Sequence, residues 1–368
     1  MRQHGGVLFR THFERIHVKK LPHLRDLNIE FSGEPPDDRR MNAIPYKHLV
    51  ITGKNGSGKT ALLSSIHKCL VDFEEDNEKK ELTSPALELE FYGQEKEGFI
   101  SDFRKWFKDR HFVYCYFPAN GRLDDNQIKD LSGFLQGLKI KANDGSIESV
   151  KFAQIIKDFE SDLKELFALE NDFTFVFKSD TDVYLWERNG REHPFTRLPH
   201  GFKALLGVFG TLRNVVHKQG SEPSTAKGLV LIDEPELHLH VAWQKTFMTK
   251  IVKMFPNIQF IIATHSPFIL NSVSNAVVFD LEKQIHFTEM TMYSNKGLVE
   301  HYFNTDMYSE EIKDKYEQYM KLIDKSDRTN DDEKDLARIR EEFFMLTRGI
   351  ADELILAVKM RELEQEDD

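Results

Sequence analysis

The sequence predicts an α/β fold with parallel central strands, and three observations support this prediction. Short, wholly apolar runs at 229–232 and 260–263 are typical of strands that are covered on both faces. The stretch between them, 243–254, has helical spacing, which indicates a strand–helix–strand unit. A third run, 48–52, leads directly into the glycine-rich loop 53–60 and then into another predicted helix.

The remaining elements follow from the same patterns. Apolar and polar residues alternate at 16–18 and 27–31, which predicts two antiparallel strands before the loop. After the loop we expect, in chain order, a helix ending in the charged run 74–81, strands at 87–91 and 112–117, helical segments from 127 to about 169, a hairpin of 173–177 with 183–186, a strand at 276–279, a polar linker at 324–335 and a last amphipathic helix at 336–363.

Composition and charge exclude several classes of protein. The chain has 368 residues, 40% of them hydrophobic, which is enough for a large core. A net charge of −11 does not favour nucleic-acid binding by the surface as a whole. One local candidate for contact with DNA is a basic N-terminal group that consists of Arg2, Arg10, Arg15, Lys19, Lys20 and Arg25. An equally good alternative is that these residues form a solvated strand edge.

The cysteine content and the lengths of the apolar runs indicate in which cellular compartment the chain is expected. Cys69 and Cys115 are the only cysteines and lack metal-ligand spacing, which favours a reducing compartment. No apolar run approaches ~18 residues, and no signal-peptide pattern follows the first residues. We therefore expect a cytoplasmic chain without a membrane span.

The glycine-rich loop carries the first candidate site. It reads Gly53-Lys54-Asn55-Gly56-Ser57-Gly58-Lys59-Thr60 and matches the phosphate-binding pattern G-x-x-x-x-G-K-[ST]. Glycines let backbone N–H groups converge on phosphate oxygens, and the following helix N-terminus adds a favourable dipole. We expect Lys59 to neutralise the β- and γ-phosphates of a nucleotide and the Thr60 hydroxyl to bind Mg²⁺.

Polar residues follow two of the apolar strands. Asp233 is expected to hold Mg²⁺ through water, and Glu234 to orient and deprotonate an attacking water molecule. The stretch Asp-Glu-Pro-Glu is also typical of a helix start, but the phosphate-binding loop favours the catalytic interpretation. After the next strand, His265 is placed to contact the γ-phosphate and to respond to its loss. His238 and His240 lack further ligands at suitable spacing, so no zinc site is expected.

The order of these motifs resembles the ABC-type ATPase heads of the RecF, SMC and OLD-nuclease group, over about residues 10–285. More narrowly, 198–206 and 237–240 resemble the PtuA ATPases of Septu and retron anti-phage systems. The resemblance implies an ABC-type P-loop head that binds ATP with Mg²⁺. It divides the chain into a first ATPase lobe (1–126), a helical insertion (127–170), a second lobe (171–290) and a helical C-terminal extension (291–368).

In such heads, a signature motif from the opposing head completes each phosphate loop. The matching segment here is 198–203, in which Gly201 keeps a close backbone approach to the γ-phosphate. The usual serine is absent, with Pro199 and His200 in its region, so we expect slow hydrolysis. Asn120 is a candidate ligand of Mg²⁺ or water, with a loop-turn role equally open.

The resemblance also implies a function and partners. It implies a nucleotide-dependent regulator of a separate nuclease, of HNH type and encoded nearby, in anti-phage defence. A RecF-like repair ATPase that acts directly on DNA and an ATP-binding scaffold without turnover remain alternatives. Homo-oligomers are expected through ATP-bound heads and through an apolar stripe on the C-terminal helix. The alternatives for the stripe are folding back on the head and packing on a nuclease partner. That stripe consists of Leu336, Ile339, Phe343, Leu346, Ile350, Leu354 and Val358.

Overall fold

The computed structural model divides the chain into two compact units, Met1–Asn295 and Lys296–Asp368. The first unit carries the α/β fold and the second carries a pair of helices. The residues described are 12–30, 46–76, 78–79, 81–91, 99–109, 111–119, 125–167, 173–178, 183–187, 190–237, 239–288, 290–294, 297–298, 310–325 and 327–345.

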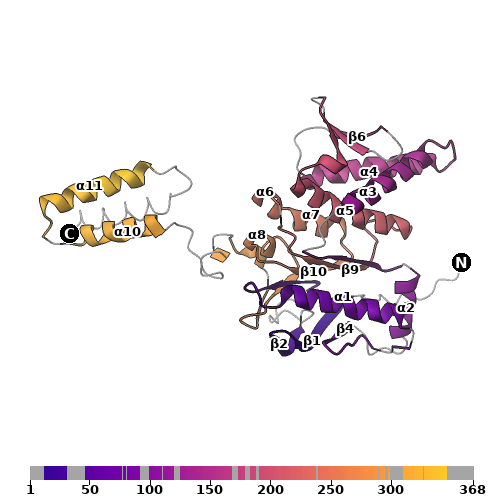
Figure 1. The fold of residues 1–368 in the computed structure, drawn as a ribbon, viewed down its shortest axis with the longest axis horizontal. Coiled ribbons are helices and arrows are strands. Elements are labelled where there is room, and N and C mark those ends of the chain that lie inside the picture. Colours follow the sequence, from indigo (N-terminus) through magenta and orange to yellow (C-terminus); the bar gives the residue numbers. More distant parts are fainter. Residues whose placement is uncertain are drawn as a thin grey trace, which may run out of the picture. The chain divides into compact units, whose positions relative to one another are not determined.

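A six-stranded sheet forms the centre of the first unit, and it confirms the predicted α/β class (Figure 1). In spatial order its strands are β12 (Ile285–Thr288), β11 (Ala276–Asp280), β3 (His48–Thr52), β10 (Ile258–Ala263), β9 (Gly228–Asp233) and β5 (Val113–Phe117). The strands from β11 to β5 are parallel, and β12 runs antiparallel to β11. Every residue of β3, β9, β10 and β11 is buried, which explains their largely apolar sequences.

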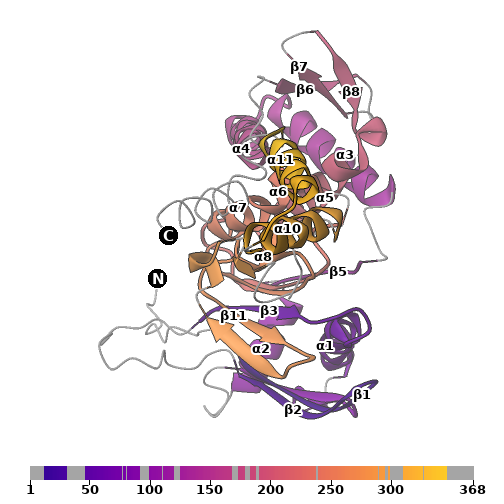
Figure 2. The same ribbon diagram turned by 90° about the vertical axis from the view of Figure 1, so that its left-hand side faces the viewer.

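A second, antiparallel sheet covers one side of this centre. It consists of β2 (Leu24–Glu30), β1 (Phe13–Leu21) and β4 (Leu87–Phe91). Helices α1 (Lys59–Glu75) and α2 (Phe99–Lys108) share one hydrophobic core with both sheets, and Figure 2 shows β1 and β2 on the far side of these helices from β3. This packing fixes the helix that starts in the glycine-rich loop.

Part of the candidate basic patch lies on this antiparallel sheet. Arg15 forms ion pairs with Glu30 and Glu90 on the neighbouring strands. Lys19 likewise pairs with Glu88. These acids offset the positive charge and favour the strand-edge interpretation, while Arg2 and Arg10 lie outside the described residues.

Helices cover the other face of the central sheet (Figure 1). They are α3 (Asp125–Ala142), α4 (Ser149–Phe167), α5 (His200–Lys218) and α7 (Phe247–Met254), followed outward by a hairpin sheet of β6 (Phe173–Phe177), β7 (Val183–Glu187) and β8 (Glu192–Pro194). Phe159 of α4 packs on Phe209 of α5 with ring centroids 5.0 Å apart. The short 3₁₀ helix η1 (Phe195–Arg197) leads from the hairpin into α5.

The prediction of one continuous helix at 243–254 is wrong, because this segment forms two short helices. A short helix, α6 (Val241–Gln244), precedes α7, and Thr246 occupies the N-cap position of α7. The side chain of His240 accepts a hydrogen bond from the backbone N–H of Ala242 and thereby caps α6. The two short helices connect β9 to β10, as the strand–helix–strand prediction requires.

The second unit contains α10 (Glu310–Ile323) and α11 (Asn330–Met345). The prediction of a polar linker at 324–335 extends too far along the chain, because α11 begins at Asn330. Thr329 and Asp332 exchange hydrogen bonds across the first turn, and acidic residues there suit the helix dipole.

The apolar stripe of α11 packs against α10 within the same unit. Ile339 and Phe343 join Tyr319 and Ile323 in a small core, with Leu336 packed beside them. The sequence suggested the head, another subunit or a nuclease partner for this stripe, and α10 is a partner that it did not anticipate. Leu346, Ile350, Leu354 and Val358 lie outside the described residues. Among the helices that the structure describes, none has both the length and the apolar character needed to cross a membrane.

Candidate functional site

The candidate residues meet at the carboxyl ends of three neighbouring strands. β10 lies between β3 and β9, and Ala263 pairs with both Ile51 and Asp233. The glycine-rich loop after β3, the acidic turn after β9 and the Thr264–Ser266 segment after β10 therefore leave the sheet side by side. Parallel α/β sheets bind ligands at this edge.

The glycine-rich loop has the backbone that its sequence requires. Gly53 and Gly58 have φ angles of 134° and 101°, in the left-handed region that favours glycine. A Cβ on Gly53 would lie 2.9 Å from Ser57 Oγ, and a Cβ on Gly58 would lie 3.1 Å from Leu24 Cδ1. The loop is therefore tightly packed at Gly53 and Gly58, and Lys59 is the first residue of α1.

Lys59 is directed at the loop itself. Its Nζ donates hydrogen bonds to the carbonyl oxygens of Gly53 (2.9 Å) and Lys54 (3.1 Å). Burial lowers the pKa of Lys59, and the nearby carboxylates of Glu234 and Asp233 oppose that shift. The ammonium group thus lies inside the loop that is expected to bind phosphate.

Asp233 is a buried carboxylate with unused hydrogen-bonding capacity. It is 4% exposed, and neither Oδ atom has a hydrogen bond of ordinary geometry. Burial raises the pKa of Asp233, and the charge of Glu234 raises it further. The Thr60 hydroxyl and the Ala119 N–H approach the carboxylate outside ordinary hydrogen-bond geometry, and together with Lys59 they lower the pKa in part. Buried polar atoms almost always have a well-formed hydrogen bond, so two carboxylate oxygens without one, beside a hydroxyl, fit a hard divalent cation such as Mg²⁺.

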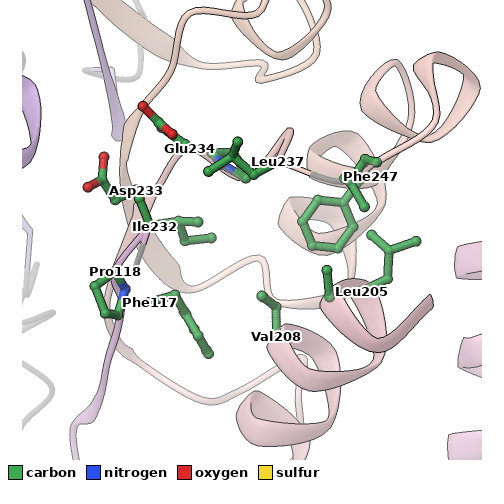
Figure 3. Close-up of a pocket in the computed structure, with 13 residues that line it drawn as sticks. Phe117, Pro118, Leu205, Val208, Ile232, Asp233, Glu234, Leu237 and Phe247 are labelled. Atoms are coloured by element: carbon green, nitrogen blue, oxygen red, sulfur yellow. The ribbon is translucent and has the colours of Figure 1, made fainter. Parts of the chain in front are cut away.

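Glu234 is held in an unusual backbone conformation. Its φ angle is 51°, and its N–H donates to the Ala263 carbonyl oxygen at 2.8 Å. A left-handed residue other than glycine costs of order 1–3 kcal/mol, so the surrounding structure must enforce it. Figure 3 shows the carboxylates of Asp233 and Glu234 directed away from an apolar cavity of about 60 Å³, whose lining includes Leu205 and Phe247.

His265 lies half-buried in the loop after β10. Burial lowers the pKa of His265, and the positive charge of Lys59 lowers it further, while Asp233 opposes the shift. The imidazole is therefore neutral at neutral pH, with one nitrogen available as a donor and the other as an acceptor.

Glu236 is a site residue whose role the sequence did not reveal. Its Oε1 accepts hydrogen bonds from Thr264 Oγ1 (2.7 Å), the His265 N–H (2.8 Å) and the Ser266 N–H (3.1 Å). Burial raises the pKa of Glu236, whereas its own backbone N–H and the hydrogen bonds from His265 and Thr264 lower it in part. The available signal was the second acid in the Asp-Glu-Pro-Glu stretch.

Other candidates lie elsewhere or outside the described residues. Gly201 is in the first turn of α5, whose N-cap is Pro199. Asn55 and Gly56 lie within the loop, where the Ser57 N–H donates to the Lys54 carbonyl oxygen. Asn120 and His238 are not among the described residues, within which no group of three or more His, Cys, Asp or Glu side chains is arranged to hold a metal.

Comparison with known proteins confirms the resemblance that the motifs predicted. Residues 87–271 match the family model described as "AAA domain, putative AbiEii toxin, Type IV TA system". The retron Vc95 probable ATPase of Vibrio cholerae serotype O1 biovar El Tor is 29% identical over 201 residues, which cover 48% of this chain and 37% of the relative. The Septu protein PtuA of Bacillus mycoides (strain KBAB4) is 25% identical over 316 residues, which cover 77% of this chain and 43% of the relative.

Among solved structures, the SMC head domain from Thermotoga maritima matches 73% of this chain and 94% of that chain, with 17% sequence identity and a TM-score of 0.40. The matched regions span less than half the length of the two curated relatives.

Proposed function

Because the chain belongs to the AAA-domain family whose model matches residues 87–271, we propose that it is an ABC-type ATPase that binds ATP with Mg²⁺ and hydrolyses it slowly. One observation supports this proposal above all others. The buried Asp233 carboxylate has no hydrogen-bond partner of ordinary geometry, and it lies beside the phosphate-binding loop and the residues that open α1.

Each residue has a distinct role in this proposal. The backbone N–H groups of 53–60 surround the phosphates, and Lys59 exchanges its two carbonyl acceptors for phosphate oxygens. Thr60 and Asp233 would hold Mg²⁺, and the bound ion would offset phosphate charge. Glu234 accepts a proton from the attacking water molecule, and neutral His265 donates a hydrogen bond to the γ-phosphate.

The finer part of the proposal concerns regulation. Gly201 at the start of α5 would complete the site of an opposing copy, so that ATP promotes assembly of two heads. The assembled state would control a separate HNH-type nuclease in anti-phage defence. The names of the retron and Septu relatives support this defence context.

Isothermal titration with Mg-ATP tests the site. Wild type should bind, and Lys59→Ala should lose tight binding because it removes the charge that offsets the phosphates. Exposed Glu222→Ala is the control for a change elsewhere in the same unit. Equal affinity of folded Lys59→Ala and wild type would refute the proposed phosphate site. A parallel titration with duplex DNA tests the RecF-like alternative, which requires ATP-dependent DNA binding by this chain alone.

A further inference from the structure

The Glu236 carboxylate connects the two loops that carry Glu234 and His265. It lies two residues after Glu234, and one of its oxygen atoms accepts three hydrogen bonds from the segment Thr264–Ser266. These donors come from the residue before His265, from His265 itself and from the residue after it. The backbone that carries the imidazole is therefore fixed to the turn after β9.

We propose that Glu236 is a positioning residue that holds His265 where its imidazole meets the γ-phosphate. This inference rests on the proposed ATPase function. Glu236 would touch neither nucleotide nor water, and it would act through the backbone of His265. A shift of the turn after β9 would consequently move His265 as well.

The choice of a carboxylate supports positioning over simple packing. Burying a charged group is unfavourable, so an apolar side chain would serve packing better. A charged acceptor, however, forms shorter and stronger hydrogen bonds than a neutral one. All three donors converge on Oε1, while the buried Oε2 has no partner, so the hydrogen bonds of Glu236 are concentrated on the His265 loop.

Further hydrogen bonds complete the connection between the loops. The Ser266 N–H also donates to Thr264 Oγ1 (2.9 Å), and Ser266 Oγ donates to Gln244 Oε1 (2.8 Å). Gln244 Nε2 in turn donates to the Leu239 carbonyl oxygen (3.0 Å), which lies in the segment after β9. Two routes thus join the same pair of loops, and the Glu236 route ends at His265 itself.

The test combines Glu236→Ala, His265→Ala and the double variant, with Glu222→Ala as an exposed control. Glu236→Ala should lower the turnover number about 10–100-fold, as loss of an orienting partner typically does, and leave ATP affinity unchanged. Glu236→Gln keeps an oxygen acceptor and should retain most of the activity. The double variant should be no slower than His265→Ala alone, because Glu236 acts through His265. Rate losses that multiply in the double variant would overturn the proposal, as would unchanged turnover in Glu236→Ala.

A spectroscopic measurement separates this inference from the ATPase proposal. In nucleotide-free protein with isotope-labelled histidine, the His265 imidazole signals are assigned by their loss in His265→Ala. Glu236→Ala should shift these signals, and Glu236→Gln should largely preserve them. If Glu236→Ala is unfolded, Thr264→Val, which removes one of the three donors, takes its place and should also shift them. Unchanged signals in the folded variant would overturn the positioning role, even if wild type proved unable to hydrolyse ATP.

Discussion

Replacing Asp233 with asparagine should stabilise the nucleotide-free protein while abolishing its response to Mg-ATP. The native carboxylate is buried without a hydrogen bond of ordinary geometry, and its pKa is raised chiefly by burial, so its charged form is disfavoured in the folded state. An unpaired buried polar group costs about 1–3 kcal/mol. An amide keeps part of that cost, so we expect a gain of about 1 kcal/mol. For a unit of this size this corresponds to a Tm increase of about 2 °C.

The pH dependence of this effect has a definite sign. Because the folded-state pKa of Asp233 lies above its ordinary value of 3.8, the cost of the carboxylate is fully present above the folded-state pKa. The cost disappears as the pH falls below 3.8. The stability advantage of Asp233→Asn should therefore be largest at neutral pH and shrink on acidification.

Thermal unfolding with and without Mg-ATP provides the assay. Wild type should gain stability from the ligand, and Asp233→Asn should not. Asp280→Asn is a matched control, because Asp280 is also buried but its Oδ1 accepts hydrogen bonds from the N–H groups of Glu282 and Lys283. It should not be stabilised. A lower Tm for nucleotide-free Asp233→Asn, or an undiminished response to Mg-ATP, would refute the reasoning.

Two further predictions concern the proposed base and the second unit. Glu234→Gln should keep ATP binding and slow phosphate release about 10²–10⁴-fold, because the amide cannot accept the proton; a near-wild-type rate would assign the base to another group. Phe343→Ala should destabilise the α10–α11 pair by about 3–5 kcal/mol, since Phe343 is buried against Tyr319, and limited proteolysis should then cut within 310–345. The ATP affinity of Phe343→Ala should equal that of wild type, because the candidate site residues all belong to the first unit. If Phe343→Ala resists proteolysis as well as wild type does, the small core contributes little to stability.

The centre of the first unit could be predicted from its sequence because the inner strands of the central sheet are buried on both faces. β9 and β10 have wholly apolar cores, and β11 differs from its prediction by one residue. The break between α6 and α7 was missed because the apolar spacing continues across Lys245 and Thr246. The packing of Ile339 and Phe343 on α10 was missed because periodicity identifies an apolar face and gives no information about its partner.

Some features of the candidate site could likewise be predicted from the sequence, and others could not. The glycine-rich loop and the carboxylates at the end of β9 have local sequence patterns, and the strand order then brings them together. The three hydrogen bonds to Glu236 join residues 28 to 30 positions apart, so no local pattern reports them. The left-handed φ of Glu234 was equally hidden, since that conformation is uncommon for a residue other than glycine.

Phosphate release from ATP by the wild-type chain, in Mg²⁺ and in excess EDTA, tests the central claim most directly. The unpaired oxygens of Asp233 and the position of Lys59 in the phosphate-binding loop predict slow release that requires Mg²⁺ and exceeds that of Lys59→Ala. Release that is equal in EDTA, or that never exceeds the rate of folded Lys59→Ala, would contradict the assignment of this edge of the sheet as an ATPase site.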